Sequence, residues 1–169
     1  MTAGAGTTDG AAQRQGGNGG RRRSIARLAA VQALYQLELN PGLEPDSVIR
    51  EFARHRLGRE IDGEVYGEAD EAMFADLVRG IWAERERLDE TIAAALSQDW
   101  PLPRLETILR LILEAGAYEL VHRLDIPPRV TLSEYIAIAH AFFAGKEPGL
   151  ANGVLDHLAR TLRGGDLQP

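Results

Sequence analysis

The sequence predicts an all-α protein, and three observations carry that prediction. Apolar residues recur at steps of three and four over most of the chain beyond residue 24. No window alternates with the period of two that marks a strand. Proline and glycine separate the periodic segments into six or seven helices. A chain of 169 residues suits one such domain with a tail, because it is long enough to bury a core without a disulfide or metal.

The first 20 residues are expected to form a disordered leader, which leaves 21–169 as the helical domain. The leader holds seven of the 18 glycines and no large apolar side chain after Met1, so it has nothing to bury that would offset its ordering entropy. Ser24 is a plausible N-cap for the first helix, although the arginines before it could already be helical. An apolar face follows, ended by Asn40-Pro41-Gly42, and consists of Leu28, Val31, Tyr35 and Leu39.

Two further helices are expected in the first half of the chain, separated by a glycine-rich, charged loop at 57–70. The shorter runs from Asp46 to Arg56 and would bury Val48, Ile49 and Phe52. The longer helix carries an apolar stripe that begins with Phe74, Leu77, Val78 and Ile81 and weakens toward Leu96. The helix ends before Trp100-Pro101-Leu102-Pro103. Pro103 suits the first turn of the next helix.

The segment 104–123 is apolar around most of its circumference, which predicts a helix in the middle of a bundle. Ile126-Pro127-Pro128 then breaks the chain. Thr131 and Glu134 have the spacing of a capping box and are expected to open a helix that ends near Gly145. A last helix begins at Pro148 and stops at Gly164-Gly165.

The composition and motifs argue against an enzyme. There is no Cys, which excludes disulfides, thiolate metal sites and a cysteine nucleophile, and there is no glycine-rich phosphate loop, Gly-x-Ser-x-Gly or HExxH motif. The four histidines stand apart, and the acids at 84–90 alternate with arginines as on a solvated helix face. No cofactor or metal is expected. No apolar run approaches the ~20 residues that cross a bilayer, and a secretory signal is absent, so we expect a soluble cytoplasmic protein without membrane contact.

Charge is distributed unevenly along this acidic chain. Residues 1–37 hold five arginines and one acid, a net +4, whereas 38–169 hold 14 basic and 24 acidic residues, a net −10; together these give the net charge of −6. The planar fork of arginine suits phosphate, so the basic end could grip a polyanion locally. By charge alone, the cluster could equally serve to solubilise a tail.

Several segments resemble the NusB family of bacterial transcription antitermination factors. The likeness covers about residues 21–163, and its most specific parts are Arg21-Arg22-Arg23 leading into Val31-Gln32-Ala33-Leu34-Tyr35, and the late Asn152-Gly153-Val154-Leu155-Asp156. The other matching residues are Phe74-x-x-Leu77-Val78-x-Gly80, Ala117-Tyr118-Glu119-Leu120, and Ile126-Pro127-x-x-Val130 with Glu134.

The resemblance implies an all-helical fold of two small packed bundles and no enzymatic activity. It implies binding of boxA RNA together with NusE, a small ribosomal subunit protein, in an antitermination complex on RNA polymerase. The RNA-binding candidates are Arg21, Arg22, Arg23 and Arg27, with Lys146, the only lysine, in the loop before the last helix. Tyr35 lies where the family meets NusE, although it could belong to the core instead.

Three other positions have structural roles in this interpretation. Tyr118 and Glu119 are expected to contribute packing and a buried ion pair, and Asn152 to cap the last helix or tie it to the preceding loop. The chain departs from the usual family pattern at Leu109, Glu114, His140, Gly149 and Leu150. These departures bear on partner contacts and RNA affinity more than on the fold.

Two alternatives remain open at this point. The protein could be a helical scaffold that binds only proteins, or a homodimer, with an incidental basic leader. An RNA-binding module fused to an RNA methyltransferase fits poorly, because 169 residues leave no room for a cofactor domain.

Overall fold

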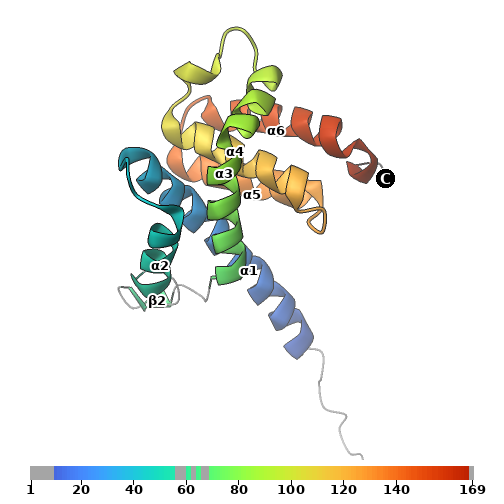
Figure 1. The fold of residues 1–169 in the computed structure, drawn as a ribbon. Coiled ribbons are helices and arrows are strands. Elements are labelled where there is room, and N and C mark those ends of the chain that lie inside the picture. Colours follow the sequence, from blue (N-terminus) through green and yellow to red (C-terminus); the bar gives the residue numbers. More distant parts are fainter. Residues whose placement is uncertain (1–9, 56–59, 62–63, 66–68, 168–169) are drawn as a thin grey trace, which may run out of the picture.

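The computed structural model describes residues 10–55, 60–61, 64–65 and 69–167, and within these the protein is all-helical apart from one short hairpin (Figure 1). The six α-helices are α1 (Gly10–Leu39), α2 (Pro45–His55), α3 (Glu71–Ala95), α4 (Thr107–His122), α5 (Pro128–Phe142) and α6 (Glu147–Arg163). Two 3₁₀ turns, η1 (Leu102–Arg104) and η2 (Gly164–Leu167), precede α4 and follow α6. Within the expected loop, β1 (Glu60–Ile61) pairs antiparallel with β2 (Glu64–Val65).

The all-α prediction is confirmed, and most helix bounds agree closely with the sequence pattern. The start of the first helix differs, because α1 begins at Gly10 and not at Ser24. The side chain of Ser24 therefore does not cap the helix; its hydroxyl lies 3.0 Å from the Gly20 carbonyl one turn back and 2.8 Å from Glu134, and its single hydrogen is shared between these two acceptors. Residues 1–9 of the expected leader lie outside the described residues, and 10–20 are part of α1.

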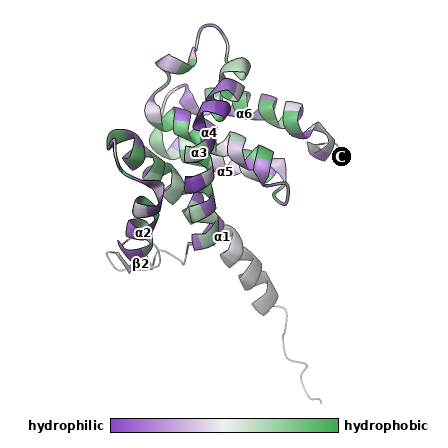
Figure 2. Ribbon diagram, viewed as in Figure 1, coloured by the Kyte–Doolittle hydropathy of each residue, from purple (hydrophilic) through white to green (hydrophobic). Residues whose placement is uncertain are grey.

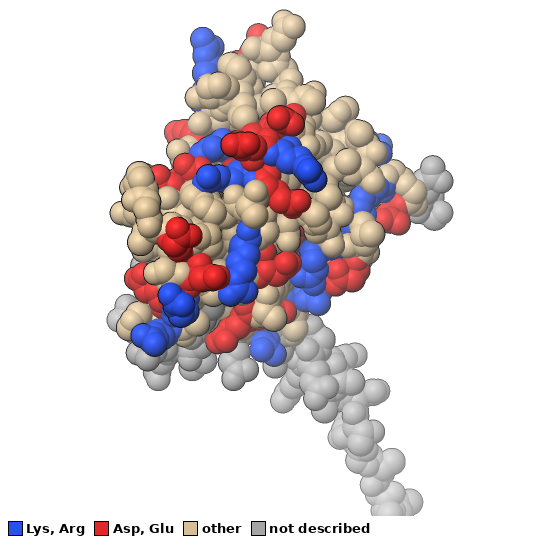
Figure 3. Space-filling model, viewed as in Figure 1, with Lys and Arg blue, Asp and Glu red and all other residues tan. Residues whose placement is uncertain are grey.

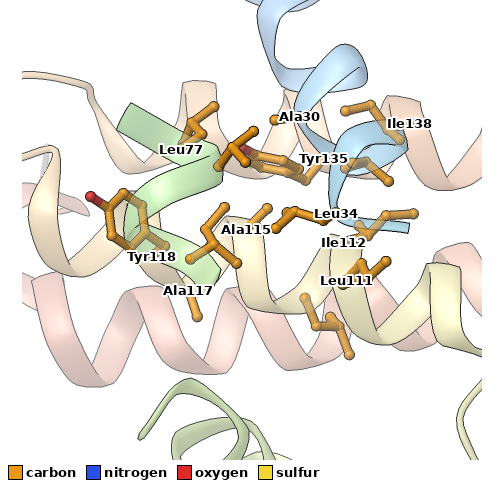
Figure 4. Packing of buried hydrophobic residues seen from close by; sticks show 14 of the residues in the cluster. Ala30, Leu34, Leu77, Leu111, Ile112, Ala115, Ala117, Tyr118, Tyr135 and Ile138 are labelled. Atoms are coloured by element: carbon orange, nitrogen blue, oxygen red, sulfur yellow. The ribbon is translucent and has the colours of Figure 1, made fainter. Parts of the chain in front are cut away.

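Helix α4 lies at the centre of the molecule, as its apolar circumference predicts. It packs against α1, α3, α5 and α6, and every residue from Leu111 to Leu120 is buried (Figures 1 and 2). Around it, the ring of Tyr135 from α5 lies among aliphatic side chains that include Ala30 of α1 and Ile138 (Figure 4). Burying one such large side chain stabilises the fold by about 1.5–3 kcal/mol.

Two glycines allow the helices around α4 to approach it closely. A Cβ at Gly80 of α3 would lie 2.1 Å from the hydroxyl of Tyr118, and one at Gly116 would lie 2.7 Å from a methyl of Leu155. The Tyr118 hydroxyl points away from the core cluster and donates to Asp76 at 3.1 Å (Figure 4). The packing role expected for Tyr118 is thus confirmed, and Gly80 has a steric reason to be glycine.

A buried polar network joins α1, α4 and α5. The Arg27 guanidinium donates to both carboxylate oxygens of Glu119, through Nε at 2.7 Å and Nη2 at 3.3 Å, and the two side chains are 1% and 0% exposed. The same carboxylate accepts from Tyr135 at 2.7 Å and from Thr131 at 3.0 Å. Each carboxylate oxygen of Glu119 thus accepts two hydrogen bonds. A buried charge is tolerated when it is paired and hydrogen-bonded in this way. The ion pair expected at Glu119 is confirmed.

The capping box predicted at Thr131 and Glu134 is wrong. Helix α5 begins at Pro128, one turn earlier, because proline in a first turn has no N–H to satisfy and its φ already suits a helix. The Thr131 hydroxyl therefore faces inward and binds Glu119, and it does not bond to the backbone of its own helix. Glu134 lies on the α1 side, where it accepts from Ser24.

A second buried carboxyl, that of Glu114 in α4, has no such partners. The side chain is fully buried, and both of its oxygens lack a hydrogen-bond partner in the part of the chain that the structure describes. Burial, reinforced by the nearby charge of Asp89, raises its pKa from 4.5 to about 8, although Arg110 and Arg85 oppose the shift. Arg110 is engaged with Glu38 of α1 at 2.6 Å and Asp89 of α3 at 3.7 Å. Glu114 is therefore a neutral acid at pH 7.

Replacing Glu119 by glutamine should destabilise the fold strongly, because the Arg27 charge would stay buried without its main partner. Breaking a buried ion pair by removing one partner costs about 3–5 kcal/mol, or roughly 10 °C in melting temperature for a chain of this size. Thermal unfolding followed by circular dichroism measures the change. The matched control is Glu86→Gln on the exposed side of α3, which should shift the melting temperature little. Equal melting temperatures for the two variants would contradict a structural role of the network.

Replacing Glu114 by glutamine should stabilise the protein increasingly as the pH rises from 4.5 toward 8. In that window the folded chain retains a proton that the unfolded chain releases, so the free energy of unfolding of the natural protein falls with rising pH. Glutamine does not titrate, so the free energy of unfolding of the variant does not fall in this way. In the natural protein the fall amounts to about a few kcal/mol. Urea unfolding at several pH values measures the difference. A difference that does not depend on pH would show that the Glu114 carboxyl is ionised in the folded state.

Candidate nucleic-acid interface

Arg21, Arg22 and Arg23 form one basic edge at the N-terminal part of α1, which we call the arginine edge. Arg21 and Arg22 are exposed and Arg23 is half-buried, so these side chains can reach a ligand in solution. The arginines are helical because the helix continues through them from Gly10, and arginine itself has a good helix propensity. The edge therefore presents its charges on a regular backbone.

Contacts from α3 and α5 hold the arginine edge in place. The backbone N–H of Asp70, the N-cap of α3, donates to the Arg22 carbonyl at 3.1 Å, and the Asp70 carboxylate lies 3.9 Å from Arg23 Nε. On another side, the Ser24 hydroxyl donates to Glu134 at 2.8 Å. An exposed pair such as Arg23–Asp70 contributes little stability, but these contacts together define where the edge lies.

Arg27 does not belong to this edge, although it was predicted to bind RNA. Its spacing of four residues from Arg23 places both side chains on the same side of the helix. One turn further along, however, that side faces α4 and α5, and the guanidinium is 1% exposed and committed to Glu119. Desolvation lowers the pKa of Arg27, but the bond to Glu119 and the neighbouring charges outweigh it, so the pKa is raised. A group buried in this way cannot reach a phosphate.

Lys146 is exposed but lies far from the arginine edge. Helix α1 runs antiparallel to α4, since Arg27 meets Glu119 and Glu38 meets Arg110. Helix α6 runs in the same direction as α4, since Leu155 meets Gly116 and Arg163 meets the turn after Arg123. Lys146, just before α6, therefore lies toward the C-terminal end of α1. A ligand that touched both sites would have to span roughly the 25 Å length of α6.

The cap predicted at Asn152 is wrong, because this residue lies inside α6. The helix begins earlier, at Glu147, with Pro148 in its first turn. The side chain of Asn152 is exposed, which suits contact with a ligand better than a role in tying the helix to its loop.

An apolar groove runs along the C-terminal half of α1, and we call it the α1 groove. Its volume is about 320 Å³, and it is lined by Val31, Gln32, Tyr35, Gln36, Leu39, Asn40, Ile108 and Phe142. Leu39 is 60% exposed, Phe142 is 39% exposed, and the ring of Tyr35 is half-buried. Tyr35 is partly buried and packs against the core cluster, in addition to lining the groove. Leu39 is exposed, so the predicted apolar stripe is wrong in placing Leu39 on the core face. The buried face of α1 is built instead from small side chains and leucines such as Ala30 and Leu34, which let α1 lie close to α3 and α4.

Sequence reasoning found one wall of this groove and missed the others. Tyr35 was singled out, but Phe142 reaches the groove from the end of α5 and Ile108 from the start of α4. Leu109, where the family commonly has an acid, is 1% exposed and belongs to the core. Nothing in the local pattern around Phe142 indicates that it comes to lie beside α1.

Charged side chains of both signs lie on the face drawn in Figure 3. Blue basic residues and red carboxylates are interspersed there without a broad area of one sign. The arginine edge is thus a short basic site and not part of an extended basic surface on this face. Among the described residues no group of histidines, aspartates and glutamates is arranged to hold a metal ion. None of the described helices is both long and apolar enough to cross a membrane.

Comparison with known proteins gives one consistent result. The model of the NusB family matches residues 24–160. The transcription antitermination protein NusB of Nitrobacter hamburgensis is 50% identical over 145 residues, covering 86% of this chain and 90% of the relative. That of Caulobacter vibrioides is 49% identical over 147 residues, covering 87% and 98%. These relatives are transcription factors, in agreement with the expectation that the chain is not an enzyme.

Solved structures agree with the sequence comparison. NusB of T. maritima superposes with a TM-score of 0.68 at 27% identity, covering 86% of this chain and 95% of that one. A chain in the crystal structure of a plectonemic RNA supercoil has the same fold, with a TM-score of 0.68 at 23% identity over 83% of this chain and 96% of its own length. A family match over most of the chain and relatives at half identity lead to one conclusion: this protein belongs to the NusB family.

Proposed function

We propose that this protein is a cytoplasmic transcription antitermination factor that binds boxA-type RNA together with NusE and supports transcription of ribosomal RNA. The arginine edge is the single observation that carries the RNA part of this proposal. Three consecutive arginines lie at the surface of an otherwise acidic protein, on a helix fixed by Asp70 and Glu134. Arginine side chains held in this way can form paired, charge-assisted hydrogen bonds to phosphate oxygens.

The uneven charge supports a mechanism in which RNA binding is local. Residues 38–169 carry a net −10 and would repel a polyanion from most of the surface. Phosphate contacts at the arginine edge would fix the position of a single strand, and its unpaired bases would be read by side chains nearby and by the partner protein. Lys146 would contact RNA only if the strand extends along the molecule toward the α1 groove.

The α1 groove supports the protein part of the proposal. It exposes Leu39, Phe142 and one face of Tyr35 on a surface bordered by the amides of Gln32, Gln36 and Asn40. An apolar centre with a polar rim is the usual anatomy of a protein interface. We assign this groove to NusE, which would leave the arginine edge, about 24 Å away along α1, free for RNA. A complex of this kind would then join RNA polymerase.

The RNA assignment predicts that Arg22→Ala combined with Arg23→Ala weakens binding of a labelled boxA-type RNA by about tenfold or more, because two charge-assisted contacts are lost. The loss should be larger at about 50 mM than at about 200 mM salt, since the natural protein releases more counterions on binding. Fluorescence anisotropy measures affinity and circular dichroism verifies that helicity is retained.

The matched control is Arg87→Ala combined with Arg104→Ala, which removes the same charge from exposed positions distant from the edge. This control should bind RNA nearly as well as the natural protein. Adding NusE should tighten binding for the natural protein, and Tyr35→Asp should remove that gain while leaving the affinity for RNA alone unchanged. Equal losses for both double variants would refute the arginine assignment. A stable NusE complex that never binds RNA would favour the alternative, a scaffold that binds only proteins and forms either this complex or a homodimer.

A further inference from the structure

The turn between α4 and α5 displays a large apolar side chain beside the arginine edge. Leu124 is 70% exposed, more than any other large hydrophobic residue in the described part of the chain. Val121 and Val130, on the helices that flank the turn, are also exposed, at 41% and 42%. A single exposed leucine on a mobile loop would need no explanation. The construction of this turn is what makes Leu124 unusual.

A buried arginine at the end of α6 holds the turn through hydrogen bonds to its backbone. Arg163, the last residue of α6, is 6% exposed, and its guanidinium donates to the carbonyls of Arg123, Leu124 and Ile126 at 3.3, 3.4 and 3.0 Å. Its Nε donates to Asp166 at 2.8 Å. One buried cation thus donates to three backbone carbonyls of the turn between α4 and α5. In Figure 1 the end of α6 and the turn after α4 lie on the same side of the molecule.

The surface of the turn is also held by side chains. The Arg123 guanidinium donates to both carboxylate oxygens of Asp125, at 3.0 and 3.1 Å, and lies 3.9 Å from Asp76. The bond to Arg123 is the largest cause that lowers the pKa of Asp125, and the charge of Arg23 on α1 contributes to the same shift. Helix α1 runs antiparallel to α4 and Arg27 meets Glu119, so Arg23, one turn before Arg27, lies level with Arg123, one turn after Glu119. The turn that follows Arg123 is therefore near the arginine edge.

We infer that Leu124 packs against a base of single-stranded RNA whose phosphates are held at the arginine edge, and that Arg163 positions the turn for this contact. The inference rests on the proposed function. An apolar side chain on a held turn near phosphate-binding arginines offers an unstacked base a surface on which its face can pack. The acids near the turn, Asp76 of α3 and Asp125 of the turn itself, are paired with Arg123, which limits their repulsion of the strand.

The direct experiment compares Leu124→Ser, Leu124→Phe and a control, Leu43→Ser, in binding of labelled boxA-type RNA without NusE. Leu124→Ser should weaken binding about three- to tenfold, because an apolar contact with a base is lost. Leu124→Phe should bind at least as tightly as the natural protein, since an aromatic ring stacks on a base better than leucine does. Leu43→Ser changes another exposed leucine, which lies between α1 and α2 and outside both the arginine edge and the α1 groove, and should bind as the natural protein does.

Salt dependence separates this contact from a loss of charge. The slope of the logarithm of affinity against the logarithm of salt concentration counts neutralised phosphates. Leu124→Ser should retain the natural slope, whereas Arg22→Ala with Arg23→Ala should reduce it by about 1.4 for a single strand. Arg163→Met, verified to be folded by circular dichroism, should weaken binding as Leu124→Ser does and add little to it in the double variant, because both act through the turn.

Three outcomes are decisive. Natural affinity in Leu124→Ser, together with weak binding in the arginine variant, would overturn the inference and leave the proposed function in place. Equal weakening by Leu43→Ser would also overturn it, since the effect would not be local to the turn. Failure of the natural protein to bind RNA under any condition would overturn the proposed function and the inference with it.

Discussion

The buried ion pair between Arg27 and Glu119 is the constraint on which the arrangement of this molecule depends. It joins α1 to α4, and the hydroxyls of Thr131 and Tyr135 bring α5 to the same carboxylate. Replacing such a pair by apolar residues is often neutral or stabilising, so its main consequence here is geometric. A charge that must meet its partner in the core fixes how far α1 is displaced along α4, and therefore where the arginines one turn earlier emerge.

This constraint divides α1 into three segments with different roles. The N-terminal part carries the arginine edge, the middle is buried against α3 and α4, and the C-terminal part forms a wall of the α1 groove. RNA and a protein partner assigned to the two ends would not compete for surface, yet both would bind the same rigid helix. The turn held by Arg163 would extend the RNA side of this arrangement, because the antiparallel pairing of α1 and α4 places the turn that carries Leu124 toward the arginine edge.

Local patterns predicted the helices well and the side-chain roles less well. Periodicity with proline and glycine breaks was sufficient to locate the helices, and the apolar circumference of α4 placed it at the centre. The same periodicity could not separate Arg23 from Arg27, because the burial of Arg27 depends on Glu119, 92 residues away in the sequence. Thr131 matched a capping box for a similar reason: its true partner lies on another helix. Phe142 lines the α1 groove and Arg163 holds the turn after α4, but no pattern in the sequence around either residue indicates these contacts.

The central claim is that two arginines on one side of α1 have different roles, Arg23 in RNA binding and Arg27 in the stability of the core. Measuring Arg23→Gln and Arg27→Gln side by side tests this claim most directly. Melting temperature and RNA affinity are measured for both variants, with affinity taken at a temperature where both remain folded. We expect Arg23→Gln to lose affinity at an almost unchanged melting temperature, and Arg27→Gln to melt roughly 10 °C lower while its folded form retains affinity. An Arg27→Gln protein that melts normally but binds RNA weakly would contradict the account.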